Sequence, residues 1–294
     1  MDPLESLLLG GLQGATEFLP VSSSGHLVLA EHLLHLTPSL AFNAALHAGT
    51  LAAVVGYYRR DLWAMVVQVF VSLAGLFRGR GAKAIWAEDH STRLALLIVC
   101  GTVPTAIIGL GLKDRVEQAM ASASATCGAL LVTGLLLIAT RFADKSNAQS
   151  ASDAASAAEG DAEPASALSP TKVTLWIALI IGVAQGLAVF PGISRSGATL
   201  AAALLLGVAR ADAARFAFLL SIPAILGALV LEGKELAALG SGDGLSLAVG
   251  VGSAVVVGYL SLALLVALVR RGGLHHFAWY VIPAGIAGLI YFNL

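Results

Sequence analysis

The chain alternates long apolar stretches with short polar ones. Six of the apolar stretches are long enough to cross a hydrocarbon core about 30 Å thick, and they cover residues 41–58, 93–112, 118–141, 211–231, 245–269 and 274–292. We therefore predict six transmembrane helices. A further apolar stretch, 62–77, is assigned to the membrane interface, because a seventh span there would scatter the charged residues discussed below.

Two other apolar regions, 4–36 and 173–208, are each interrupted midway by a polar run. Residues 17–26 read EFLPVSSSGH, and residues 191–197 read PGISRSG. Each half is too short to cross a bilayer alone, and non-helical backbone at membrane depth is tolerated only where it is buried in protein or lines a cavity. We predict a re-entrant pair of half-helices in each region.

The two interrupted regions are related in sequence. Residues 10–27 and 182–199 align without gaps and are identical at seven positions, which are Gly10/Gly182, Gln13/Gln185, Gly14/Gly186, Phe18/Phe190, Ser22/Ser194, Ser24/Ser196 and Gly25/Gly197. Matches of Gln, Phe and two Ser in register indicate an internal repeat. Three predicted spans, an odd number, follow each copy, so the second copy enters the membrane from the opposite side.

The predicted fold is thus an all-α polytopic membrane protein, with six transmembrane helices, two re-entrant helix pairs and an inverted-topology repeat. Its parts are a first repeat over 1–142, a linker over 143–170 and a second repeat over 171–294. The linker is rich in Ala and Ser and lacks apolar periodicity, which is typical of a flexible connection. Inverted repeats place binding sites near the midplane, where two broken segments meet.

Charge gives the orientation. In this topology one side carries twelve Lys and Arg residues and the other three, Lys113, Arg115 and Lys234. The positive-inside rule puts the first side in the cytoplasm, so the first re-entrant pair enters from the outer face and the second from the cytoplasm.

The composition, 57% hydrophobic and 12% charged with a net charge of −1, excludes a nucleic-acid partner, which would need a concentrated basic face.

Ionisable residues inside a membrane region are costly and point to function. Gln13 and Glu17 lie four residues apart and share a helix face. Their oxygens suit a hard divalent cation, Mg²⁺ or Ca²⁺, and Glu17 also suits a general base. Alternatively, Glu17 caps the broken helix. His26 completes the ionisable groups of this copy.

The second copy supplies a cation, Arg195, whose planar guanidinium suits phosphate. A structural ion pair with Glu17 is the alternative. The Ser-rich runs are helix N-cap signals. The N-terminus of the helix that follows each run exposes backbone N–H groups that can bind an anion. We therefore predict a phosphate site divided between the copies. Arg195, Ser194, Ser196, Thr199 and backbone amides would hold the phosphoryl oxygens, while Glu17 and His26 would do proton or nucleophile work.

The motifs QxxxEFLPVSSSGH at 13–26 and FPGISRSGAT at 190–199 resemble the undecaprenyl-pyrophosphate phosphatase family of bacteria, also called bacitracin-resistance proteins. The resemblance covers nearly the whole chain, including ARFAFLLSIP at 214–223, and departs from the family in its long linker. Position 13 is Gln rather than Glu, which the family also allows and which leaves one carboxylate fewer for a metal.

The resemblance implies hydrolysis of undecaprenyl pyrophosphate to the monophosphate, which recycles the lipid carrier of cell-wall synthesis. It also implies a divalent cation, an inner-membrane location and a site reached from the periplasm, and it leaves a homodimer open. Carried over by position, the resemblance implies the catalytic residues Glu17, Ser23, His26 and Arg195, and the substrate-binding residues Gln13, Ser22, Ser194, Ser196, Thr199, Gly192 and Gly197. It leaves the nucleophile open between Ser23, His26 and water. From the residues alone, a transporter or flippase of lipid phosphate or another anion is the alternative, because inverted repeats with broken helices are typical of transporters.

Overall fold

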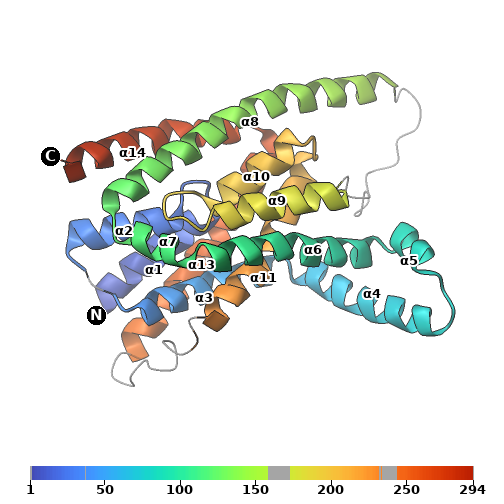
Figure 1. The fold of residues 1–294 in the computed structure, drawn as a ribbon, viewed down its shortest axis with the longest axis horizontal. Coiled ribbons are helices and arrows are strands. Elements are labelled where there is room, and N and C mark those ends of the chain that lie inside the picture. Colours follow the sequence, from blue (N-terminus) through green and yellow to red (C-terminus); the bar gives the residue numbers. More distant parts are fainter. Residues whose placement is uncertain (1, 37, 158–172, 232, 234–243, 294) are drawn as a thin grey trace.

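The computed structural model describes residues 2–36, 38–157, 173–231, 233 and 244–293. Within these ranges the chain is helical and contains no strand (Figure 1). The helices are α1 Pro3–Phe18, α2 Ser23–Leu34, α3 Leu40–Tyr57, α4 Arg59–Phe77, α5 Ala82–Glu88, α6 His90–Gly111, α7 Lys113–Met120, α8 Ala123–Ala157, α9 Leu175–Leu187, α10 Arg195–Leu205, α11 Arg210–Leu231, α13 Gly244–Arg271, η2 Leu274–Phe277 and α14 Ala278–Asn293.

Five helices in the described ranges are long and apolar enough to cross a membrane, namely α4, α6, the Ala123–Ala143 part of α8, α11 and α13. The prediction of an all-helical polytopic membrane protein is therefore confirmed at this level. The set of six predicted spans is not reproduced. Helix α4, which we had assigned to the interface, is among the five because its charged residues are confined to its first turn. Helix α3, with 18 residues, matches the predicted span 41–58 to within one residue, and α14, with 16 residues, is shorter than the predicted span 274–292; neither is among the five.

The predicted linker also differs in part from the structure. Helix α8 continues through Ala157, fifteen residues into the 143–170 segment. Alanine has the highest helix propensity of all residues, so an Ala-rich stretch can extend a preceding helix without an apolar face. The remainder, 158–170, lies outside the described residues.

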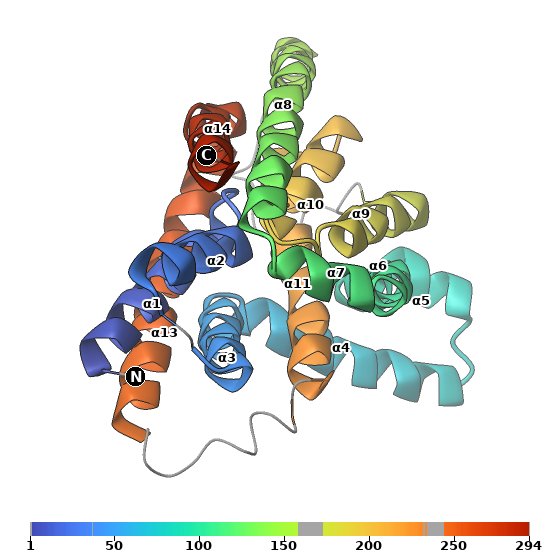
Figure 2. The same ribbon diagram turned by 60° about the vertical axis from the view of Figure 1, so that its left-hand side comes forward.

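Both interrupted regions consist of two helices with a break between them, as predicted: α1 and α2 in the first, α9 and α10 in the second. Helix α1 packs along α13, and α9 packs along α6 (Figure 2). Both contacts are built on glycine. A Cβ atom at Gly10 would lie 2.1 Å from the carbonyl oxygen of Gly250, and one at Gly182 would lie 2.0 Å from that of Gly101. Small residues let membrane helices approach this closely, which explains why glycine recurs at both positions.

Helix α11 forms much of the buried core next to the end of α1. Phe216, Leu219 and Leu220 of α11 are almost fully buried, and the ring of Phe18, at the end of α1, meets Phe218 edge to face at 5.9 Å. This packing fixes the end of α1, and therefore fixes the backbone of Glu17 next to it. An ion pair between Arg215 of α11 and Asp61 ties α4 to the same core.

Candidate active site

The two helix breaks are joined by hydrogen bonds. The Ser22 hydroxyl of the first break accepts a hydrogen bond from the N–H of Gly192 in the second, at 3.1 Å. In return, the Ser196 hydroxyl of the second donates to the carbonyl of Leu19 in the first, at 3.1 Å. The N-termini of α2 and α10 therefore meet at one place. Helix N-termini carry partial positive charge and leave their first N–H groups without an intrahelical partner, so their convergence favours an anion.

Ser22 has an unusual backbone. Its φ of 71° lies in the left-handed region although it is not glycine, which costs on the order of 1–3 kcal/mol. Its hydroxyl offsets part of this cost, since it also caps α2 by accepting from the N–H of Gly25 at 3.3 Å. Strained residues of this kind cluster at functional sites, and Ser23, which follows, is the first residue of α2.

Glu17 is the centre of a polar cluster in an otherwise apolar interior. Its side chain is only 2% exposed. One carboxylate oxygen, Oε2, accepts a 2.5 Å hydrogen bond from the Ser23 hydroxyl and a 2.8 Å bond from the Gln13 amide. The other oxygen is paired with Arg195. The structure thus brings together four of the predicted site residues, two from α1, one from α2 and one from α10.

Arg195 pairs with Glu17, as our alternative interpretation proposed, and it retains capacity for a second anion. Its Nη2 atom donates to Glu17, whereas its Nη1 atom is buried and has no hydrogen-bond partner among the described residues. A buried donor without a partner is costly, so this nitrogen favours a ligand that can accept. A phosphoryl oxygen at the meeting point of α2 and α10 would be such an acceptor.

His47 of α3 also belongs to the cluster, and sequence reasoning missed it. Its Nδ1 atom lies 2.9 Å from the Gln13 amide nitrogen and 3.6 Å from Glu17 Oε2. An amide nitrogen can only donate, so Nδ1 accepts and the neutral ring carries its proton on Nε2. His47 therefore holds the Gln13 amide with its N–H groups toward Glu17. The only signal in the sequence was a histidine inside an apolar stretch.

The other predicted residues of the second break are engaged within the protein. Ser194 caps α10 by accepting from the N–H of Gly197 at 3.1 Å, and Thr199 donates to the carbonyl of Arg195 at 2.8 Å. Gly192 has a φ of 93°, and a Cβ there would lie 2.2 Å from the carbonyl oxygen of Thr126. These residues, together with Ser196, shape the break that presents Arg195.

His26 lies apart from the Glu17 cluster. Its Nδ1 atom is 2.8 Å from the carbonyl oxygen of Ser22, and its Nε2 atom is 2.8 Å from the hydroxyl of Tyr280 on α14. Both ring nitrogens are therefore occupied. A histidine nucleophile needs a free lone pair on the attacking nitrogen, so this arrangement favours Ser23 or water over His26.

The described residues contain no group of three or more His, Cys, Asp or Glu arranged for a metal ion. The donor set nevertheless fits a hard cation of the Mg²⁺ or Ca²⁺ type. Such ions are often held by one or two carboxylates together with substrate phosphates. Glu17 supplies the carboxylate, and the amide oxygen of Gln13 is buried without a hydrogen-bond partner.

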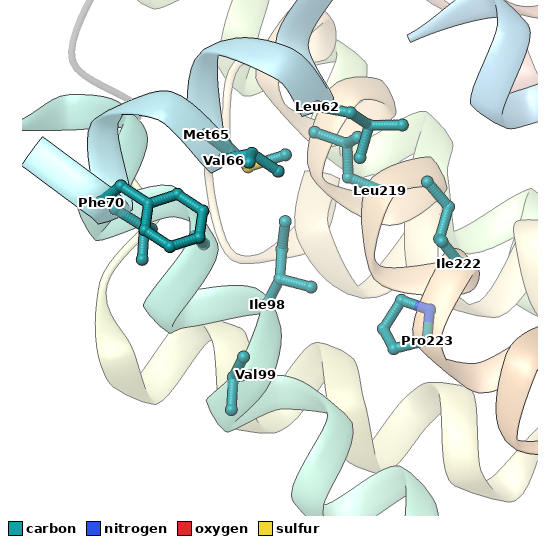
Figure 3. Close-up of a pocket in the computed structure, with 11 residues that line it drawn as sticks. Leu62, Met65, Val66, Phe70, Ile98, Val99, Leu219, Ile222 and Pro223 are labelled. Atoms are coloured by element: carbon teal, nitrogen blue, oxygen red, sulfur yellow. The ribbon is translucent and has the colours of Figure 1, made fainter. Parts of the chain in front are cut away.

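A cavity of about 360 Å³ lies away from this cluster, between α4, α6 and α11 (Figure 3). Its lining includes Leu62, Met65, Ile98, Leu219, Ile222 and Pro223. Every lining residue is apolar, so the cavity offers no acid, base or anion-binding group. The chemistry of this protein is therefore to be sought at the two helix breaks.

The family model described as bacitracin resistance protein BacA matches residues 6–287. The chain belongs to the BacA family. Three similar proteins bear the name undecaprenyl-diphosphatase. Those from Desulfosudis oleivorans, Geobacter metallireducens and Methanosphaera stadtmanae are 44%, 40% and 39% identical, and each alignment covers at least 97% of both chains. The resemblance read from the two motifs is thereby confirmed, and the BacA match spans both helix breaks and the helices between them.

Proposed function

We propose that this protein is an integral membrane phosphatase that hydrolyses undecaprenyl pyrophosphate to undecaprenyl phosphate and inorganic phosphate. The observation that carries the proposal is the 2.5 Å hydrogen bond from the Ser23 hydroxyl to Glu17, with Arg195 on the other carboxylate oxygen. A hydroxyl bonded to an oriented carboxylate is the arrangement of an activated nucleophile. The named relatives and the BacA family match supply the substrate.

In the first step the Ser23 oxygen attacks the terminal phosphorus while Glu17 takes the hydroxyl proton. The bond between that phosphorus and the bridging oxygen breaks, and undecaprenyl phosphate leaves with the bond's electron pair. Water then attacks the phosphoserine, the bond between phosphorus and the Ser23 oxygen breaks, and Glu17 returns the first proton to that oxygen. The proton that the water loses passes to a phosphoryl oxygen or to solvent, and inorganic phosphate leaves. Gln13 holds Glu17 in position throughout.

The charge that develops on the phosphoryl oxygens needs donors that are already in place. Arg195 Nη1 and the first N–H groups of α2 and α10 supply them, since the two breaks hold these groups rigidly together. A divalent cation, held by Glu17 and the Gln13 amide oxygen, would neutralise charge on the pyrophosphate when bound.

We further propose that the halves 1–142 and 171–294 form an inverted repeat in a bacterial inner membrane, with the site reached from the periplasm. Two observations support this. Helix α1 packs on α13 of the second half and α9 packs on α6 of the first half, and both contacts use the glycines that the halves share. The distribution of Lys and Arg supports the orientation.

The test is phosphate release by the purified protein from a polyprenyl pyrophosphate in detergent. Ser23→Ala is compared with Ser24→Ala, which removes the neighbouring hydroxyl on the same helical turn. We expect at least a thousandfold loss for the first and less than a threefold change for the second. Rapid quenching with labelled substrate should trap phosphate on Ser23. Full activity of Ser23→Ala would refute the serine mechanism, and intact substrate with the native protein would refute the function.

A further inference from the structure

The last helix contributes a side chain that contacts His26, one of the predicted catalytic residues. Tyr280 of α14 lies 254 positions from His26 in the chain, yet its hydroxyl is 2.8 Å from His26 Nε2. The two rings also stack, with centroids 5.7 Å apart and planes inclined by 22°. Tyr280 is 52% exposed, so its ring stands at the edge of the protein rather than in the core. Packing alone does not require a hydroxyl there.

The hydrogen bonds fix the tautomer of His26. The carbonyl of Ser22 can only accept, so Nδ1, at 2.8 Å, must carry a proton. In the neutral ring Nε2 then presents a lone pair, and the Tyr280 hydroxyl donates to it. When Nε2 gains a proton, the same hydroxyl can rotate and accept. Tyrosine is therefore a partner for both protonation states, which suits a histidine that exchanges protons.

The position of His26 makes this pairing relevant to the reaction. His26 lies three residues after Ser23 on α2, and side chains three apart share a helix face. Ser22, which binds the imidazole through its carbonyl, also locks the two breaks together through its hydroxyl. The imidazole is thus held from one side by the strained turn and from the other by α14.

We infer that Tyr280 is a positioning residue of the active site, which orients the His26 imidazole through its hydrogen bond to Nε2 while the Ser22 carbonyl fixes the Nδ1–H tautomer. The inference rests on the proposed phosphatase function. Tyr280 acts through His26 and does not itself bind the reacting phosphorus. Helix α14 thereby becomes part of the site, in addition to α1, α2, α3 and α10.

The test is a double-mutant cycle measured as kcat and KM for phosphate release from a short-chain polyprenyl pyrophosphate. Tyr280→Phe keeps the stacked ring and removes only the hydroxyl. We expect it to lower kcat about fivefold, the effect of one lost hydrogen bond, and to leave KM within twofold. In the His26→Gln background the same substitution should change kcat by less than 1.5-fold, because residues that act through each other are non-additive. Tyr291→Phe, on the same helix, is the control and should match the native protein.

A second measurement is independent of activity. The ¹⁵N chemical shifts of the His26 imidazole, assigned by their loss in His26→Gln, should report the Nδ1–H tautomer in the native protein and in Tyr280→Phe, but the Nε2 signal should move in Tyr280→Phe because that nitrogen loses its hydrogen bond. Equal kcat losses in both backgrounds, or an unchanged Nε2 chemical shift in Tyr280→Phe, would overturn the inference. If Ser23→Ala and Glu17→Gln are inactive while the cycle is additive, the role of Tyr280 alone fails. If both remain active, the proposed serine mechanism fails, and if the native protein leaves the substrate intact, the proposed function fails.

Discussion

The substitution Glu17→Gln separates the chemical role of this carboxylate from its structural role. The side chain keeps its size, and its amide oxygen can still accept from Arg195. Its amide nitrogen, however, then faces the Gln13 nitrogen, which lies 2.8 Å from Glu17 Oε2 in the native site. Two donors would oppose each other there, and Ser23 would lose its proton acceptor.

The two effects have different sizes. Loss of a general base lowers the rate by about 10²–10⁴-fold, which corresponds to roughly 3–5 kcal/mol of barrier. The structural cost is smaller, about 1–3 kcal/mol for hydrogen bonds to a charged group, because Arg195 keeps an acceptor. We therefore expect at least a hundredfold loss of kcat in a protein that still folds.

The assay is phosphate release in detergent, combined with a thermal unfolding scan of the same sample. Glu31→Gln is the matched control. Glu31 also lies in an interrupted region and accepts a 2.9 Å hydrogen bond from an amide, that of Asn43, but it is remote from Ser23 along α2. It should keep kcat within threefold. A Glu17→Gln protein with more than a tenth of native activity would refute the assignment of Glu17 as the base.

Three further predictions concern packing, positioning and the cation. Gly182→Ala should lower the free energy of unfolding by about 3 kcal/mol or more, because the added methyl group would overlap the Gly101 carbonyl and the packed helices have no room to move apart. Gly252→Ala, with open space around it, should leave the melting temperature unchanged. His47→Leu should reduce kcat about tenfold with little change in melting temperature, because it frees the Gln13 amide; native activity in this variant would exclude a role for His47. Removal of divalent cations with a chelator should lower kcat at least tenfold, and Mg²⁺ or Ca²⁺ should restore it; activity that persists in the chelator would contradict the cation proposal.

Much of the fold follows from short-range physics that a sequence displays. Apolar length predicted the helices, and the polar interruptions predicted the breaks after Phe18 and before Arg195. The Ser-rich runs were identified as N-cap signals, and in the structure Ser22 and Ser194 cap the next helix. Whether α4 crosses the membrane could not be decided from charge alone, because its charged residues lie in its first turn and leave the rest apolar.

The site was predictable only in part. Charged side chains inside apolar regions pointed to Glu17 and Arg195. The sequence could not show that Gln13, identical in both copies, binds Glu17, whereas the amide of its counterpart Gln185 donates to the carbonyl of Leu220 in the core at 3.3 Å. His47 was equally hidden, since its role depends on how α3 packs beside α1.

The pairing of Glu17 with Arg195 has a consequence for biogenesis. The two residues are 178 positions apart, and translation proceeds at roughly 5–20 residues per second. A nascent chain therefore carries the Glu17 carboxylate into or beside the bilayer for about 10–35 s before its counter-charge exists. During that interval the carboxylate must be protonated, hydrated or shielded by the insertion machinery. Catalytic competence consequently begins only after the second broken helix has been inserted.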